Sequence, residues 1–284
     1  MKKFLKQNVL TIAIMLVFLI GLAVMIYPAV SDYFIKRSQS RVVASYRQVV
    51  ERMDPREIER MFTEAQEYNE RLLLKPNRFE FTEEDYEEYY TMLSVDTDGV
   101  AVIGSLEIGL INVDLPIYHG TSESVLQVAI GHLEGSTLPI GGPQTHAVIT
   151  GHRGLPSALL LTELDRMGIG DTFVLHVLNE TMTYMVDQIL VVEPTDFSSL
   201  IVDPEMDYVT LLTCTPYGIN SHRLLVRGHR IENEEAATIV RTVILSEARM
   251  VRRQLALFVI FIPALIILST VKIILNMHNR KKDK

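Results

Sequence analysis

Two long stretches without charged residues, one near each end of the chain, constrain the fold more than any other feature. The first runs from Gln7 to Ser31 and the second from Gln254 to Val271. A membrane-spanning helix needs about 20 predominantly apolar residues. Both stretches meet this length, the second if Lys272 reaches toward the interface and the helix continues to Leu275. The sequence therefore predicts two transmembrane helices with a folded domain between them.

Each stretch also has another interpretation. The first resembles a secretory signal peptide, but its apolar part is longer than a usual signal core and Pro28–Ser31 is a poor cleavage site. We therefore interpret it as an uncleaved anchor. The second has the alternative of a buried core helix. The basic tail that follows it favours a membrane span.

The basic residues that flank the two stretches predict the orientation of the chain. Lysine and arginine accumulate on the cytoplasmic side of membrane spans. They are Lys2, Lys3 and Lys6 before the first span, and Lys272, Arg280, Lys281, Lys282 and Lys284 at or after the end of the second. Arg252 and Arg253 lie on the other side and argue weakly against this orientation. The sequence predicts that both termini are cytoplasmic and that residues of about 32–250 are extracellular.

The segment between the basic ends is acidic and contains a single thiol. Residues 7–271 hold 19 basic and 34 acidic residues, a net charge of about −15, which excludes a nucleic-acid binder as the default. Cys214 is the only cysteine of the chain, so it has no intramolecular disulfide partner. A lone extracellular thiol is prone to oxidation. This favours a catalytic thiol over the alternative of a small buried apolar residue.

Composition divides the chain into segments. We predict an anchor (1–31), a helical stalk with a linker (32–98), a main β domain (99–232), a juxtamembrane helix (233–253), and a second span with a basic tail (254–284). In the stalk, Asp54 caps a helix that begins at Pro55. The charged residues of the stalk form a solvated face and imply no functional site. Thr82 begins another short helix. From Gly99, short apolar runs alternate with turns, which predicts a mostly antiparallel β barrel or sandwich.

Short helices are expected between the strands at Ser122–Gln127 and Leu155–Met167. Cys214 follows a strand over Tyr208–Thr213, and Arg223 lies in the next strand, His222–Ile231. Pairing of these strands would bring the two side chains to one end of the sheet, as a nucleophile and an oxyanion stabiliser. The alternative role for Arg223 is a surface ion pair.

A thiol nucleophile needs a partner that activates it, and histidine is the usual one. Four of the eight histidines are candidates by position, and spacing alone leaves all four open: His119, His132, His146 and His152. His152 has the best local case, because it ends the strand-like run HAVITG between two glycines. The sequence shows no metal-ligand set, phosphate loop or dinucleotide fingerprint, so we expect no metal and no cofactor.

The run TLLTCTPYGINSHRLLVRG resembles the TLxTC signature and the following arginine strand of sortases, most closely those of class C, the pilus-assembling group. LPIYHG, GHLEGSTLPIGG and THAVITGHRGLP resemble other blocks of that class, in the same order over residues 99–232. The resemblance implies a mostly β fold: an eight-stranded barrel with short helices, an N-terminal helical extension and two transmembrane helices. It also implies that His152, Cys214 and Arg223 are catalytic.

The implied reaction is transpeptidation at the membrane of a Gram-positive bacterium. Cys214 would cleave an LPxTG-like sorting signal between Thr and Gly, and a lysine amine of the next pilin subunit would resolve the thioester. Thr213 and Thr215, which flank the nucleophile, are assigned to substrate binding. The loop Pro194–Met206 is expected to shape substrate choice. The expected partners are LPxTG-bearing pilins and the membrane, not nucleic acid.

The region before the barrel departs from the class C pattern. Class C sortases usually carry a lid with an Asp-Pro-aromatic motif, but here the sequence reads LLLKPNRFEFTEEDYEEYY. We therefore expect the lid to be absent, rewired or weakly held, with Phe79 or Phe81 as a replacement for the lid aromatic.

Three other functions remain compatible with the sequence. The first is a sortase that anchors surface proteins to cell-wall peptide. The second is a cysteine peptidase that releases its product to water. The third is a non-catalytic membrane-anchored scaffold with an inert core cysteine.

Overall fold

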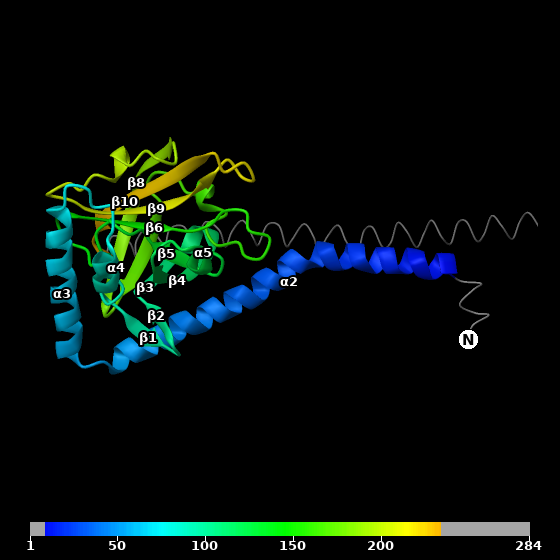
Figure 1. Cartoon of the computed structure of the whole chain (residues 1–284), viewed down its shortest axis with the longest axis horizontal. Helices are drawn as coiled ribbons and strands as arrows, with labels where there is room; N and C mark the ends of the chain where they lie inside the picture. The colour runs from blue at the N-terminus through cyan, green and yellow to red at the C-terminus, as the bar shows by residue number, and fades with distance from the viewer. Residues whose placement is uncertain (1–8, 234–284) are drawn as a thin grey trace, which may run out of the picture. The chain divides into compact units, whose positions relative to one another are not determined.

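The computed structural model describes residues 9–233. The predicted second span and most of the predicted juxtamembrane helix lie outside these residues. Eight strands close into a barrel (Figure 1). The barrel strands are β3 (Gly104–Ile108), β4 (Val113–His119), β5 (Ile130–His132), β6 (Thr145–Thr150), β7 (Thr172–Val177), β8 (Glu180–Val192), β9 (Asp207–Thr215) and β10 (His222–Ile231). The predicted mostly β, eight-stranded barrel is therefore confirmed.

The strand order around the barrel is β10-β8-β7-β3-β4-β5-β6-β9, and β9 pairs with β10 to close it. Most neighbours are antiparallel. The exceptions are β4 with β5 and β6 with β9, which are parallel. All six residues of β6 are buried, which fits a parallel strand covered on both faces. β6 and β10 thus flank β9, and this places the ends of three strands side by side.

The barrel interior is filled by alternating side chains of the strands, most of them aliphatic. Phe173 and Tyr184 stack within it at 5.6 Å between ring centroids. Gly228 faces this pair, and a Cβ added there would lie 2.8 Å from the Phe173 ring. Glycine is therefore required at this point of β10, where backbone and ring approach closely.

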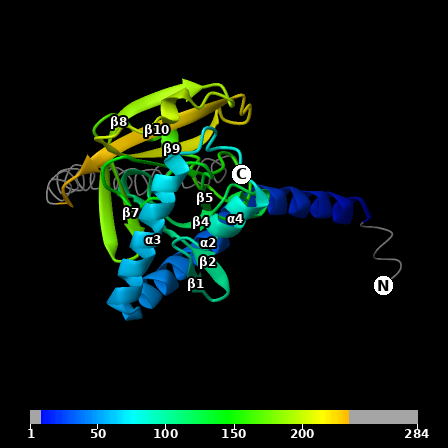
Figure 2. The same cartoon turned by 60° about the vertical axis from the view of Figure 1, so that its left-hand side comes forward.

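Two helices precede the barrel: α2 (Val9–Arg52) and α3 (Pro55–Leu73). The predicted cap is confirmed, because the Asp54 side chain accepts from the Arg56 N–H and Pro55 occupies the first turn. Figure 2 shows α3 and the C-terminal part of α2 beside the barrel. The apolar stripe of these helices packs into the main hydrophobic core rather than standing free. Its buried members are Val43, Tyr46, Val50, Ile58, Met61, Ala65, Tyr68 and Leu72. The expected stalk is therefore part of the core of the barrel domain.

From Val9 onward, the uncharged N-terminal stretch belongs to α2, which continues without a break into the part that packs on the barrel (Figure 1). Within the described residues, α2 is the one helix long and apolar enough to cross a membrane, and its most apolar window is not buried by the protein. The first predicted span thus corresponds to a helix suited to that role.

Smaller elements complete the fold: α4 (Glu83–Tyr89), β1 (Val95–Thr97), β2 (Val100–Val102), η1 (Gly109–Ile111), α5 (Glu123–Leu126), η2 (Leu164–Arg166) and η3 (Ser198–Leu200). Thr82 caps α4, and Asp85 completes a reciprocal capping box. The short helix predicted after Ser122 is confirmed as α5.

The helix predicted over Leu155–Met167 is wrong. Only η2, a single short turn, forms there. Leu160 adopts a positive φ of 41°, which a helix does not allow. The N–H of Leu159 donates instead to the Asp32 carboxylate on α2, at 2.9 Å. Burial of Ala158, Leu161 and other apolar side chains therefore holds this segment as a packed loop.

Candidate active site

Cys214 and Arg223 are direct partners on neighbouring antiparallel strands. The register of β9 and β10 pairs Arg223 with Cys214, and two residues further it pairs Leu225 with Leu212. Residues paired in this way project from the same face of a sheet. This confirms the prediction that the two side chains lie at one end of the sheet. It places a thiol and a permanent cation side by side on the outer face of the barrel.

His152 follows β6, the other neighbour of β9. The parallel ladder pairs Thr150 with Leu212, and the Gly151 N–H donates to the Leu212 carbonyl at 3.1 Å as part of that pairing. His152 comes two residues after Thr150, and Cys214 comes two residues after Leu212. The neighbouring strand ends of β6, β9 and β10 thus lead to an imidazole, a thiol and a guanidinium, and we call these three strand ends the row.

The other three candidate histidines are buried and hydrogen-bonded to the protein. His119 contacts the Met92 carbonyl at 2.6 Å, and burial lowers its pKa. Burial also lowers the pKa of His132 and of His146 to about 4. Both ring nitrogens of each of these two have protein partners. At neutral pH these rings are neutral core groups, so the structure favours His152 among the four.

An apolar cluster lies on the outer face of the barrel and includes residues of β6, β9 and β10. Its side chains alternate along the strands with those of the barrel interior. They are the buried Val148, Leu200 and Leu225, with the partly buried Phe79, Leu133, Leu190, Val192 and Leu212 packed against them. We call this set the outer cluster. Because Leu212 and Leu225 each lie two residues from Cys214 and Arg223, the cluster can hold an apolar chain segment next to the thiol.

The two threonines assigned to substrate binding have different surroundings. Thr213 is 0% exposed and its hydroxyl donates to the Gly151 carbonyl at 2.8 Å. It points into the barrel, because alternation along β9 puts it opposite Cys214. The expectation that Thr213 contacts substrate is therefore corrected: it ties β9 to the turn before His152. Thr215 is half-buried, and its hydroxyl accepts from Arg153 at 3.3 Å.

Residues 9–233 contain no group of three or more histidine, cysteine, aspartate or glutamate side chains placed to hold a metal ion. The row at the strand ends instead has the side-chain types of acyl transfer. A thiol can act as nucleophile, an imidazole as acid and base, and a guanidinium as a stabiliser of negative charge.

Comparison with known proteins agrees with this geometry. A family model described as "Sortase domain" matches residues 106–231. Sortase C1 from Streptococcus agalactiae is 46% identical, and the superposition covers 68% of this chain and 98% of that structure with a TM-score of 0.64. The chain belongs to the sortase family. Sortase C from Streptococcus pneumoniae is 48% identical, covering 68% and 97% with a TM-score of 0.61.

Both solved neighbours are class C sortases, and the chain groups with that class. Sortase D of Bacillus subtilis (strain 168) is 29% identical over 131 residues, which is 45% of this chain and 63% of that protein. Sortases are cysteine transpeptidases, and this sortase carries the single thiol of its chain in the row described above.

In this sortase, the segment that departs from the class C motif lies on the outer cluster. Phe79 packs against Phe197 at 4.8 Å between ring centroids, and the Arg78 guanidinium lies 5.0 Å from the Phe79 ring and donates to the Leu200 carbonyl. A Cβ on Gly135 would lie 2.5 Å from the Arg78 carbonyl, so the segment is in close contact with the barrel. Phe79 thus packs against the same buried side chains of the outer cluster as Leu212 does.

Phe81 lies elsewhere. Its ring packs on Tyr86 and Tyr89 of α4, at 5.1 and 5.9 Å between centroids. Of the two aromatic residues named as lid candidates, Phe79 is the one on the outer cluster.

The segment that carries Phe79 is fixed at both ends. Before it, the side-chain amide of Asn69 on α3 exchanges two hydrogen bonds with the backbone of Leu138, at 2.7 and 3.2 Å. After it, the Tyr89 hydroxyl on α4 contacts Nδ1 and the carbonyl of His132, both at 3.0 Å. We call the stretch between these anchors, residues 74–82, the strap.

One carboxylate near His152 was not predicted from the sequence. Oε2 of Glu123, at the start of α5, lies 3.6 Å from Nε2 of His152. That nitrogen is buried and has no hydrogen-bond partner within the described part of the chain. A hydrogen bond from Gln127 holds the pKa of Glu123 below its usual value, and the adjacent His152 acts in the same direction. Glu123 is therefore an anion at neutral pH, beside the His152 imidazole.

We expect Glu123→Gln to slow acyl transfer about 1.5- to 5-fold at neutral pH, the modest effect of losing one exposed ion pair. The amide keeps the shape of the side chain but removes the negative charge beside Nε2 of His152. The matched control is Glu107→Gln, because Glu107 lies 3.4 Å from His176 in a similar exposed pair. An unchanged rate of acyl transfer in Glu123→Gln would exclude this role.

Proposed function

We propose that this sortase polymerises pilins: it cleaves an LPxTG-like sorting signal between Thr and Gly and transfers the threonyl group to a lysine of the next pilin subunit. The observation that carries the proposal is the direct pairing of Cys214 with Arg223 beside the strand end that leads to His152. The grouping with class C supports the pilin as substrate.

The first half of the reaction forms a thioester. The Cys214 thiolate attacks the threonine carbonyl carbon, and the carbonyl electrons move onto oxygen. Arg223 stabilises this oxyanion. When the C–N bond breaks, protonated His152 gives its proton to the leaving glycine amine. The products are a thioester on Cys214, neutral His152 and a free glycine-led peptide.

The second half transfers the acyl group. The lysine amine attacks the thioester carbon while His152 accepts its proton, and the C–S bond breaks to restore the thiolate. The product is an isopeptide bond. Arg223 serves both halves because the oxyanion forms at the same position. In the present arrangement its Nη1 donates to the carbonyls of Asn220 and His222 at 3.3 and 3.1 Å, which holds the guanidinium at the end of β10.

The outer cluster supplies the binding site for the apolar part of the sorting signal. The loop Pro194–Met206 contributes Leu200 to this cluster and Phe197 to the packing around Phe79, which supports its proposed role in substrate choice. Phe79 of the strap packs against the same cluster, which supports a lid rewired from the class C motif. In this proposal, substrate binds to the outer cluster when the strap moves away from it.

We expect Phe79→Ala to speed modification of Cys214 by a bulky thiol reagent about 2- to 10-fold. The change removes an aromatic pair with Phe197, worth about 0.5–1.5 kcal/mol beyond its buried area, and so favours the open strap. Phe62→Ala is the matched control, because Phe62 packs partly buried against the main core rather than the outer cluster. Equal reactivity of Cys214 in wild type and Phe79→Ala would contradict the lid.

The proposed location is the extracellular face of the cell membrane, with both termini in the cytoplasm. Support comes from the basic residues at both ends of the sequence and from the length and exposed apolar surface of α2. The acidic domain between them suits an exterior surface.

The function is tested with the full chain in detergent, an LPxTG-bearing pilin and Cys214→Ala as the blank. Mass spectrometry would look for an acyl adduct on Cys214 and for lysine-linked pilin multimers. An adduct with multimers supports pilin polymerisation. An adduct resolved only by cell-wall peptide indicates an anchoring sortase, and one resolved only by water indicates a peptidase. An unreactive thiol in both wild type and Phe79→Ala would support a non-catalytic scaffold.

A further inference from the structure

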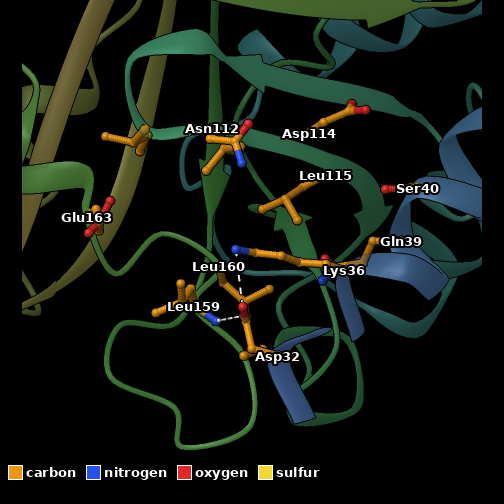
Figure 3. Close-up of a pocket in the computed structure, with 13 residues that line it drawn as sticks. Asp32, Lys36, Gln39, Ser40, Asn112, Asp114, Leu115, Leu159, Leu160 and Glu163 are labelled. Atoms are coloured by element: carbon orange, nitrogen blue, oxygen red, sulfur yellow. Dashed lines mark hydrogen bonds and ion pairs between the residues drawn. The ribbon is translucent and has the colours of Figure 1, made fainter. Parts of the chain in front are cut away.

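The loop that follows His152 is joined to α2 at the end of its uncharged stretch. That stretch ends at Ser31, and the next residue, Asp32, is the first charged residue after it. Oδ1 of Asp32 accepts the Leu159 N–H at 2.9 Å, and Oδ2 pairs with Lys36 at 3.2 Å (Figure 3). The Leu159 amide is therefore hydrogen-bonded to the residue that directly follows the uncharged stretch of α2.

This loop is unusually apolar for a connection between strands. No charged residue occurs from Gly154 to Thr162, which reads GLPSALLLT. Ala158, Leu160 and Leu161 are buried against the protein, whereas Leu159 at the tip is 43% exposed. Three side chains of the loop thus pack against the rest of the protein, and the side chain of Leu159 is exposed at the surface.

The adjoining surface of α2 has the composition of a membrane interface. Tyr27, Tyr33 and Phe34 are 56%, 58% and 63% exposed, and aromatic side chains of this kind concentrate at the headgroup level of membranes. Basic residues follow at Lys36 and Arg37. The polar side chains of the junction, Lys36 among them, line a cavity of about 290 Å³ between α2, the start of β4 and the loop (Figure 3).

We propose that residues 154–162 rest in the headgroup layer of the membrane that α2 crosses, with the Leu159 side chain inserted among the lipids. The partner is the bilayer surface itself. This inference rests on the proposed topology, in which α2 spans the membrane. It follows that His152, two residues before the loop, works at the bilayer surface, and that the enzyme accepts cleavage sites held close to that surface.

The absence of tryptophan from the chain makes a direct test possible. The full chain would be reconstituted into nanodiscs whose lipids carry bromine either near the headgroup end or deep in the acyl chains. Three single-tryptophan variants would be compared: Leu159→Trp at the loop, Leu19→Trp within the apolar stretch, and Asn179→Trp as the distant control.

Asn179 is an exposed residue of the β7–β8 turn. Its neighbour Leu178 donates its N–H to the Tyr46 hydroxyl at 2.6 Å. Tyr46 lies about 22 Å along α2 from Ser31, at about 1.5 Å per residue. Asn179→Trp therefore reports on the domain far from the membrane. Retention of acyl-adduct formation on Cys214 would show that each variant is folded.

We expect Leu159→Trp to lose more than half of its emission with shallow bromines and less with deep ones. Leu19→Trp should show the reverse order, and Asn179→Trp should lose none. Quenching of Leu19→Trp without quenching of Leu159→Trp would overturn the seating of the loop while leaving the span intact. If neither Leu159→Trp nor Leu19→Trp were quenched, the proposed membrane span of α2 would be overturned as well. Acyl transfer is measured separately, so neither result is confused with a failure of the proposed reaction.

Discussion

Replacing His152 by glutamine is expected to lower the rate of acyl transfer by about 10²–10⁴-fold, the range that general acid–base catalysis contributes. Glutamine can occupy a similar volume and donate a hydrogen bond, but it cannot give a proton to the leaving glycine amine or take one from the incoming lysine. The loss should appear in the rates of both thioester formation and thioester aminolysis. Single-turnover kinetics with a fluorogenic LPxTG peptide would measure the first, and chase with a lysine-bearing acceptor the second.

The matched control is His176→Gln. His176 also lies beside a carboxylate, that of Glu107, on the barrel surface, but it belongs to β7, away from β9. We expect its substitution to leave both rates within about twofold, the range of most surface changes. Equal losses in the two variants, or full activity in His152→Gln, would remove His152 from the mechanism.

Replacing Arg223 by lysine is expected to lower kcat/KM by about 10²–10³-fold, the usual effect of losing one oxyanion donor. Lysine keeps the charge, but it lacks the planar guanidinium, which can hold the Asn220 and His222 carbonyls through Nη1 and direct its other N–H groups to the reacting oxygen. The reaction of Cys214 with a small alkylating reagent forms no oxyanion. It should therefore change much less than peptide cleavage, and this difference separates transition-state stabilisation from damage to the thiol.

Arg227→Lys provides the matched control on the same strand. Arg227 also lies on the outer face, where it pairs with Asp187 at 2.9 Å and its guanidinium lies 4.1 Å from the Tyr208 ring. Replacing the Arg227 guanidinium should lower the free energy of unfolding while leaving kcat/KM of the folded enzyme nearly unchanged. If Arg223→Lys behaved like Arg227→Lys, the guanidinium opposite Cys214 would be structural.

The sequence predicts much of the barrel and the neighbouring positions of Cys214 and Arg223, because both depend on local patterns. Alternation along a strand fixes which residues share a face, and a short loop fixes which strands pair, so Cys214 and Arg223 were predictable neighbours. The choice among the four histidines was not predictable from spacing. It depends on burial, which separates the core rings of His132 and His146 from His152 only once the fold is known.

Features that depend on contacts between distant segments escaped the sequence analysis. Glu123 approaches His152 from α5, across 29 residues of chain, and no local pattern marks that contact. The false helix after Leu155 has the composition of a helix but is held as a loop by Asp32, which is 127 residues away. The inward orientation of Thr213 follows from alternation along β9, and the predicted substrate contact of this residue overlooked it.

The strap is anchored by Asn69 on one side and Tyr89 on the other. If the strap acts as the lid proposed above, these anchors make the enzyme sensitive to the local concentration of its substrate. A covering segment that never leaves the molecule competes with substrate at a fixed effective concentration, which is set by its length and anchors and not by the supply of any inhibitor. At low concentration, a free sorting signal is outcompeted by the strap for the outer cluster. A sorting signal that is confined near the cluster has a higher local concentration and displaces the strap. The apparent affinity for a free peptide is then reduced by the fraction of molecules with an open strap. An isolated peptide in solution would therefore be a poor substrate for an enzyme that handles a confined one well.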